Sequence, residues 1–391
     1  MSRLLIARSP DLQQLRNEGY DLEVRGGYLL IKDVPYVSSA REIKRGILIS
    51  TLELNGDQTT KPTTHVAMWT GEHPCHHDGR IIAAITNPSQ GQDLGNDVRA
   101  DFTFSAKTAY RDYHHKMTTY IGRITGEAQV IDPTVTANTF PVIAADEDES
   151  VFRYHDTATS RVGIGALNER LSSQKIAIIG LGGTGSYLLD LVAKSCVKDI
   201  HLFDRDVFSQ HNAFRSPGAA SIDELQAKPL KVTYLAEIYG KMRRGIHVHE
   251  VFADGETAAL REMDFVFLCL DRGTAKKTIV KSLVEWGIPF VDVGMGILRA
   301  QDSLTGLMRV TCFVPGAETS ALGRIDYSDG DLPENEYSTN IQIAELNALN
   351  AAFAVLQWKK VYRIYRDSSR AKSFSYSIAA NDIANDEEGA A

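Results

Sequence analysis

Cysteine is scarce in this chain of 391 residues, which contains only Cys75, Cys196, Cys269 and Cys312. No two of them have the CxxC spacing, so the sequence indicates neither a disulfide framework nor a paired-cysteine zinc site. We therefore predict reduced thiols and no structural zinc. A chain of this kind is typical of the cytoplasm.

Long apolar runs are also missing. No run approaches the roughly 18 residues that a membrane span needs. The first stretch, MSRLLIARSPDLQQLRNEGYDL, has no apolar core of signal-peptide length. The formal net charge of −8 argues against nonspecific binding to nucleic acid or to an anionic membrane. We therefore predict a cytoplasmic protein that neither crosses a membrane nor binds nucleic acid.

The length of the chain and a change in its sequence pattern indicate more than one domain. Residues 1–143 have the mixed patterns of a small α+β domain, and an acidic linker follows at 144–158. Residues 159–366 alternate apolar strands with helices, the pattern of a doubly wound, mostly parallel Rossmann-like sheet. A crossover loop is expected at 316–340. The remainder, 367–391, is expected to be a tail with a disordered end.

A glycine-rich turn opens the second domain. The stretch KIAIIGLGGTGSYLLDL, residues 175–191, predicts a buried strand, a turn and a helix. Gly180, Gly182, Gly183 and Gly185 would let phosphate approach backbone N–H groups at the helix N-terminus. Close packing of helix against strand would also explain glycines here, so the turn alone does not identify a ligand.

Polar residues follow the next strands in a fixed order. Asp204 ends a strand about 20 residues after the glycines, which suits hydrogen bonds to ribose hydroxyls. A dehydrogenase would fit up to this point. The polar residues that follow exceed what a dinucleotide needs. They are Asn212 and Arg215 in HNAFRS, Lys228, and Asp271 at the end of a strand. They suit a triphosphate with a divalent metal, whose charge must be neutralised during transfer.

This order of motifs, GxGGxG, DxD, NxxR, a lysine and a strand-terminal aspartate, resembles the ThiF/MoeB/ubiquitin-activating adenylyltransferase superfamily. The resemblance covers residues 159–315 and the closing helix. It implies that the C-terminal glycine of a ubiquitin-like protein is adenylated with ATP and Mg²⁺, and that pyrophosphate is released. By the same resemblance, ribose would bind Asp204 with Asp206 nearby. Phosphates and the attacking carboxylate would be held by Asn212, Arg215 and Lys228, and Mg²⁺ by Asp271.

The family usually adds an arginine upstream of the glycine turn, often one that reaches the ATP of a partner subunit. Arg161 is our choice, and Arg153 and Arg170 compete with it. The sequence departs from the family's NxxRQ, because Ser216 stands where glutamine is common. The family also implies a homodimer, for which the long apolar-faced helix after residue 341 is a candidate interface.

Many relatives pass the activated carboxylate to a cysteine, a step that needs an accessible thiol, preferably of low pKa. The expected crossover loop contains no cysteine. Cys312 lies just before it, within an apolar strand pattern, and Cys75 lies in the N-terminal domain. These two are the candidate acyl carriers, although burial is the simpler interpretation of Cys312.

The segment HVAMWTGEHPCHHDGRII crowds His73, Cys75, His76, His77 and Asp78 into a short loop. A metal site is possible in principle, but the spacing matches no recognised zinc pattern. The HP and DG pairs after a strand also faintly resemble the ubiquitin-conjugating fold, with Ile81–Ile82 where its cysteine would follow. We favour a binding module for a partner or for the ubiquitin-like substrate, with a degenerate conjugating domain as the alternative.

The leading hypothesis is thus an activating enzyme with a fused N-terminal domain, similar to activating proteins of bacterial ubiquitin-like conjugation operons. A conjugating enzyme is a possible further partner. A second hypothesis is adenylation of a sulfur carrier, a tRNA or a small molecule on the same fold. A third is a non-catalytic scaffold, and an NAD dehydrogenase ranks last.

Overall fold

The computed structural model describes residues 2–145, 150–161, 164–316, 319–328 and 341–385. The chain forms two compact units, Met1–Ile143 and Ala144–Ala391. Each unit has its own hydrophobic core. No described helix is both long and apolar enough to cross a bilayer.

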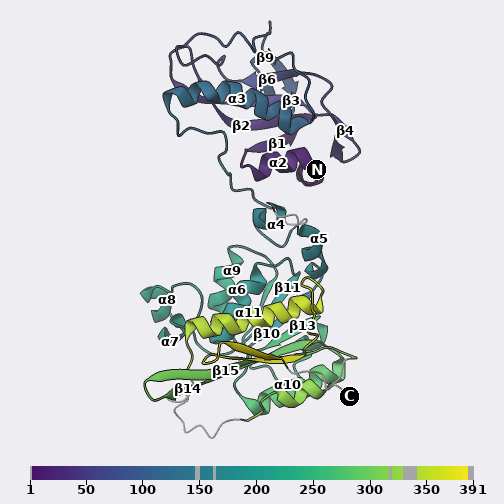
Figure 1. Ribbon diagram of the computed structural model, residues 1–391, viewed down its shortest axis with the longest axis vertical. Coiled ribbons are helices and arrows are strands. Elements are labelled where there is room, and N and C mark those ends of the chain that lie inside the picture. The colour runs from purple at the N-terminus through teal and green to yellow at the C-terminus, as the bar shows by residue number, and fades with distance from the viewer. Residues whose placement is uncertain (1, 146–149, 162–163, 317–318, 329–340, 386–391) are drawn as a thin grey trace. The chain divides into compact units, whose positions relative to one another are not determined.

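The first unit is built on an antiparallel five-stranded sheet in the order β1-β2-β3-β6-β9. Helix α3 lies along one face of this sheet (Figure 1). The strands are β1 (Leu22–Arg25), β2 (Tyr28–Val37), β3 (Ile43–Thr51), β6 (Val66–Thr70) and β9 (Phe102–Ser105), with the short hairpins β4–β5 (Leu54–Asn55, Gln58–Thr59) and β7–β8 (Gln92–Gly95, Val98–Ala100). The helices are α1 (Ser2–Arg8), α2 (Pro10–Asn17) and α3 (Tyr113–Ile131).

Helix α3 supplies much of the first unit's core. The Asp112 carboxylate caps it by accepting the His115 N–H at 2.7 Å. Tyr113, Met117 and Tyr120 follow at helical spacing and are fully buried. The helix begins at Tyr113, directly after this cap.

The second unit contains an eight-stranded sheet in the order β12-β11-β10-β13-β14-β15-β16-β17. The first five strands in this order are parallel and the last three pair antiparallel. This confirms the predicted fold class, a mostly parallel α/β sheet preceded by a smaller α+β domain. The strands are β10 (Lys175–Ile179), β11 (Asp199–Phe203), β12 (Ile246–His249), β13 (Phe265–Leu268), β14 (Phe290–Ala300), β15 (Ser303–Phe313), β16 (Ser373–Ser377) and β17 (Asp382–Asn385).

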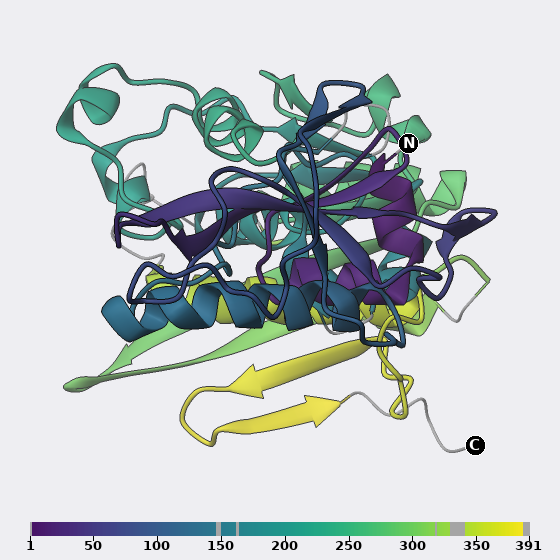
Figure 2. The same ribbon diagram turned by 90° about the horizontal axis from the view of Figure 1, so that it is seen from above.

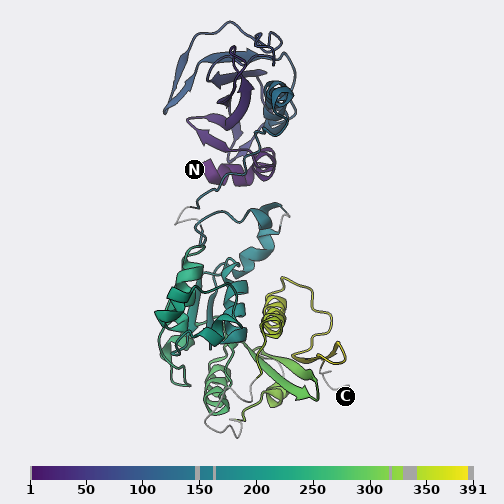
Figure 3. The ribbon, with the colours of Figure 1, turned by 90° about the vertical axis from the view of Figure 1, so that its left-hand side faces the viewer.

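Helices cover both faces of this sheet. Helices α6 (Gly183–Ala193), α9 (Lys231–Gly240) and α11 (Ala344–Val361) pack on one face, and α10 (Gly273–Trp286) packs on the other (Figures 1 and 3). The apolar strands are therefore buried on both sides, as a parallel sheet requires. Short helices complete the unit: α4 (Thr157–Arg161), α5 (Gly165–Asn168), α7 (Gln210–Ala213), α8 (Ile222–Gln226) and the 3₁₀ turns Glu169–Leu171, Ala258–Glu262 and Thr319–Arg324.

Two local expectations need correction. The pattern RVGIGALNERLSSQ predicts one continuous helix, but the described residues there form α5 and a 3₁₀ turn, in keeping with the low helix propensity of glycine. The C-terminal tail is also more ordered than its polar composition indicates. Strands β16 and β17 extend the sheet beside β15 (Figure 2), and Phe374 and Tyr376 pack on Phe353 of α11. Only 386–391 of the tail lie outside the described residues.

A buried ion pair joins α10 to β14. Lys276 Nζ lies 2.9 Å from Asp292 Oδ1, and both side chains are almost completely buried. Arg309 Nη2 lies farther away, 3.8 Å from Asp292 Oδ2. Burial raises the pKa of Asp292, and the charge of Lys276 opposes that rise. Lys276 is therefore the partner that makes a buried carboxylate tolerable here.

We expect Lys276→Met to destabilise the protein by about 3–5 kcal/mol, because it leaves a buried carboxylate without its close partner. Adding Asp292→Leu to that variant should recover most of the loss. Urea denaturation followed by tryptophan fluorescence measures both. Lys281→Met is the matched control, since Lys281 lies on the same helix with a side chain 77% exposed. Equal stability of Lys276→Met and Lys281→Met would contradict this account.

Candidate functional site

Packing explains three of the four glycines in the turn after β10. Gly180 has a φ of +87°, and a Cβ there would lie 2.7 Å from the carbonyl oxygen of Cys269. A Cβ at Gly185 would lie 1.9 Å from the Gly180 oxygen. At Gly183 it would lie 2.2 Å from Nδ2 of Asn347, a buried residue of α11. These positions need glycine whether or not a ligand binds.

Gly182 is different, because a Cβ added there would meet no atom of a described residue within 4 Å. Its φ of −70° is open to other residues, so neither packing nor backbone strain requires glycine. Gly182 is the N-cap of α6, where the first backbone N–H groups of a helix have no intrahelical acceptor. The open space therefore lies where the helix N-terminus attracts an anion, and a phosphate group fits it.

The carboxylate of Asp204 fixes this turn to the end of β11. Oδ2 accepts the N–H of Leu181 at 2.7 Å, and Oδ1 accepts the N–H of Asp206 at 2.8 Å. The side chain is 6% exposed, and its burial raises the pKa of Asp204 against the opposing charge of Lys231. A carboxylate has about four lone-pair positions, so two remain for the hydroxyls of a ribose.

Lys231, and not Lys228, reaches these carboxylates. Lys231 begins α9, and its Nζ lies 2.7 Å from Asp206 Oδ2 and 3.8 Å from Asp204 Oδ2. Its backbone N–H also donates to the Asp206 carbonyl at 2.9 Å. Lys228 is exposed, with a φ of +49°, and lines a groove of about 760 Å³ beside α7 and α8.

Lys231 is thus a candidate site residue that the sequence alone did not select. The run AKPLKV contains two lysines three residues apart, and order along the chain does not choose between them. The apolar spacing of Val232 and Leu235 was the available signal, since it predicts that a helix begins near Lys231 and carries this lysine on its first turn.

Asn212 and Arg215 lie on or next to α7. The Oδ1 of Asn212 accepts the Ser209 N–H at 2.8 Å, which caps the helix, while no described residue accepts from its buried Nδ2. Burial lowers the pKa of His211, and the charges of Arg215 and Lys231 lower it further. Both cations therefore lie within electrostatic reach of the His211 ring.

Asp271 lies between β13 and α10, and its side chain is exposed. No described residue forms an ion pair with it. The preceding Cys269 contacts the glycine turn, so Asp271 follows two residues after the point where β13 meets that turn. Mg²⁺ is commonly held by one or two carboxylates together with phosphate oxygens, and Asp271 can supply one of them.

The three candidate upstream arginines and Ser216 lie in different surroundings. The side chain of Arg161 lies outside the described residues, while its backbone ends α4. Arg153 Nε donates to the Gly240 carbonyl at 2.6 Å, and Arg170 Nη1 donates to the Arg363 carbonyl at 2.7 Å. Ser216 is buried, and no described residue bonds its hydroxyl. The choice of Arg161 therefore stays a prediction.

Residues 156–380, more than half of the chain, match the ThiF family. The chain belongs to the ThiF family. This membership supports an ATP-dependent adenylyltransferase built on a nucleotide-binding sheet. Residues 10–157 match a second family, described as a domain of unknown function, DUF6791.

Among solved structures, the ThiF-family chain is similar to PaaA and to MccB of E. coli. For PaaA the identity is 18% and the TM-score 0.46, over 69% of this chain and 82% of PaaA. For MccB crystallised with ATP the identity is 19% and the TM-score 0.46, over 57% of this chain and 66% of MccB.

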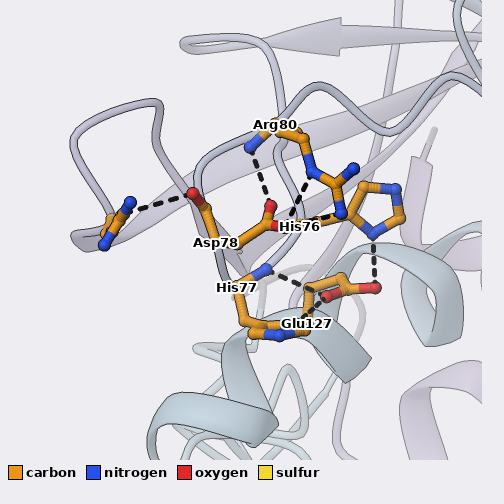
Figure 4. Close-up of polar contacts among 6 residues, drawn as sticks. His76, His77, Asp78, Arg80 and Glu127 are labelled. Atoms are coloured by element: carbon orange, nitrogen blue, oxygen red, sulfur yellow. Dashed lines mark hydrogen bonds and ion pairs between the residues drawn. The ribbon is translucent and has the colours of Figure 1, made fainter.

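The histidine loop of the first unit is tied to α3 by Glu127 (Figure 4). His76 Nδ1 lies 2.7 Å from Glu127 Oε1, while the backbone N–H and Nδ1 of His77 both lie 2.9 Å from Oε2. Asp78 pairs with Arg80 at 2.7 Å. The two rings face one carboxylate and not a common point, and within the described residues no group of three or more His, Cys, Asp or Glu side chains could hold a metal ion.

Both candidate acyl-carrier thiols lie in cores. Cys75 and Cys312 are each 1% exposed. Burial raises the pKa of the Cys75 thiol, and it raises that of Cys312 to about 12. The structure thus gives neither thiol the exposure or the low pKa that favours attack on an acyl adenylate.

We expect Gly182→Ala to fold normally, within about 0.5 kcal/mol of the wild type. Its methyl group should fill the space left for phosphate and weaken ATP binding by at least about tenfold. Gly185→Ala should instead be destabilised, because its Cβ would strike the Gly180 carbonyl. Calorimetric titration with ATP and thermal melting separate the two effects. Unchanged ATP affinity in Gly182→Ala would show that the phosphate lies elsewhere.

The Glu127 contacts predict a pH effect on stability. Burial alone would raise the pKa of Glu127, but hydrogen bonds from His77 and His76 lower it to about 2 from an ordinary value of 4.5. A carboxylate whose pKa is lower in the folded than in the unfolded chain stabilises the fold at pH values above its unfolded pKa. This stabilisation is lost as the pH falls toward the folded pKa. The stability gap between wild type and Glu127→Gln should therefore narrow from pH 4.5 to pH 2 in urea titrations. A gap that stays constant over this range would argue against these bonds.

Proposed function

We propose that the protein adenylates the C-terminal carboxylate of a ubiquitin-like protein with ATP and releases pyrophosphate. The observation that carries the proposal is the open space at Gly182 in a ThiF-family domain. The preceding Leu181 N–H donates to the buried Asp204, which Lys231 approaches. A nucleotide would place its ribose at Asp204 and its phosphates at the helix N-terminus. The same site would include Asp206 and the remaining glycines, Gly180, Gly183 and Gly185.

The polar residues around this space suit phosphoryl chemistry. An oxygen of the substrate carboxylate attacks the α-phosphorus, and the bond from that phosphorus to the pyrophosphate oxygen breaks. Negative charge grows on the phosphate oxygens, where Lys231 and Arg215 can stabilise it in a site already partly buried. Asp271 would hold Mg²⁺, which supplies further charge neutralisation when bound.

The buried thiols favour an acceptor other than Cys75 or Cys312 for the acyl group. The adenylate would then be released to a separate protein, such as a conjugating enzyme. The first unit, residues 1–143, would act as a binding module for such a partner or for the substrate, followed by the linker 144–158. As in the family generally, the adenylation domain 159–366 would form a homodimer.

ATP–pyrophosphate exchange tests the proposal. We expect exchange only when a ubiquitin-like protein ending in a free glycine carboxylate is added, and not with its C-terminal amide. Asp271→Asn should lower the exchange rate by about a hundredfold or more, because the metal loses its protein ligand. Exchange supported instead by tRNA or a small acid would favour the other adenylating hypothesis. Absence of exchange, with ATP binding unchanged in Asp271→Asn, would overturn both.

Two lysine variants provide a matched pair for this assay. Lys231→Met should lower exchange by about 10²-fold, the usual effect of removing one group that stabilises transition-state charge. Lys228→Met should leave exchange near the wild-type rate, since Lys228 is exposed and away from the carboxylates. If Lys228→Met lowered the exchange rate and Lys231→Met did not, the phosphate-binding role would belong to Lys228.

A further inference from the structure

Arg309 of β15 makes no hydrogen bond with a described residue. Its side chain is 28% exposed, but its Nε is buried and has no acceptor in the described part of the chain. Among the described residues it forms an ion pair with Asp292 alone, at 3.8 Å, which exceeds hydrogen-bonding distance. Lys276 pairs with the other oxygen of Asp292 at 2.9 Å, so the donors of Arg309 are not used within the described part of the chain.

The guanidinium group lies across the backbone of the neighbouring strand. Arg309 and Gly294 are direct partners in the β14–β15 pairing, and a Cβ at Gly294 would lie 2.8 Å from Arg309 Nη2. The guanidinium therefore covers Gly294. Gly296 is on the same face two residues farther along, and a Cβ there would meet no atom of a described residue within 4 Å. Beside Arg309, β14 thus offers at Gly296 a short strip of bare backbone that a thin, extended chain could approach closely.

Strand register places this strip beside the proposed nucleotide site. Leu268 of β13 pairs with Asp292 of β14, so Gly294 is level with Leu270, the residue before Asp271. Adjacent strands lie about 4.8 Å apart. Gly294 also shares a sheet face with Asp292, whose partner Lys276 belongs to α10, the helix that follows Asp271. Arg309 is thus at the edge of the sheet where β13 leads to Asp271, on the face that α10 covers.

Asp326 is a second acidic residue near Arg309, and its carboxylate is hydrogen-bonded elsewhere. Asp326 is exposed and uses Oδ1 to accept the Ser328 N–H at 2.9 Å and the Ser328 hydroxyl at 2.6 Å. The Ser328 bonds lower the pKa of Asp326, and the charges of Arg309 and Lys276 lower it further. Asp326 therefore lies within electrostatic range of Arg309, but no ion pair joins the two. An incoming carboxylate would be the first group to hydrogen-bond the guanidinium.

We propose that Arg309 binds the substrate carboxylate that becomes adenylated, and that the strip at Gly296 beside it admits a C-terminal tail of small residues. This inference rests on the proposed function and names the part of the chain that recognises its substrate. A planar guanidinium matches a carboxylate in a two-bond geometry that lysine lacks. Arg309 would orient the carboxylate toward the phosphate held at the glycine turn.

The test uses the full chain with a non-hydrolysable ATP analogue and a fluorescent peptide ending in Gly-Gly. The peptide is made as a free carboxylate and as an amide, and fluorescence anisotropy measures both affinities. The wild type should prefer the carboxylate by about tenfold to a hundredfold, the value of a charge-assisted hydrogen-bonded pair. Arg309→Gln should lose the preference with nucleotide affinity unchanged, and Arg309→Lys should keep only part of it.

Arg299→Gln is the matched control, because Arg299 lies on the same hairpin and its Nε donates to the Gln301 carbonyl. It should retain the full preference. A wild type that binds both peptides equally would overturn the inference, and so would an Arg309→Gln protein that keeps the preference or loses nucleotide affinity equally. If the wild type prefers the carboxylate peptide but shows no ATP–pyrophosphate exchange, the proposed function is wrong, and the assignment of Arg309 as a carboxylate-binding residue is still supported.

Discussion

The hydrogen bond from the Leu181 N–H to the Asp204 carboxylate is the constraint on which the rest of the site depends. It joins the turn after β10 to the end of β11 and sets the space beside Gly182 next to a buried acid. A buried carboxylate is costly unless it is paired, and Lys231 at the start of α9 provides the balancing charge. One interaction thus couples two strands, a helix start and the proposed ribose position.

A second buried carboxylate with a lysine partner lies on the other face of the sheet. Asp292 is held by Lys276 of α10, and Arg309 stays close without completing a hydrogen bond. Burying ions gives little net stability compared with apolar packing, so such groups often mark functional positions. The two clusters flank the carboxyl ends of β10, β13 and β14, where ligands of open α/β sheets bind.

The sequence was sufficient for the fold class, because apolar strands alternating with helices leave few other arrangements. It was sufficient to select Asp204 and Asp271 as candidates, because strand-terminal acids are visible as a pattern. It could not choose Lys231 over Lys228, since that choice depends on where a helix begins in space. Arg309 was equally hidden, because its proposed role depends on glycines of the neighbouring strand. The ordered β16–β17 hairpin depends on contacts with α11 that a polar tail does not reveal.

A crystal structure with Mg²⁺ and a non-hydrolysable ATP analogue tests the central claim most directly. The account predicts phosphate oxygens beside Gly182, ribose hydroxyls within hydrogen-bonding distance of Asp204, and the metal on Asp271. A nucleotide bound with its phosphates away from Gly182, or with its ribose not contacting Asp204, would contradict it.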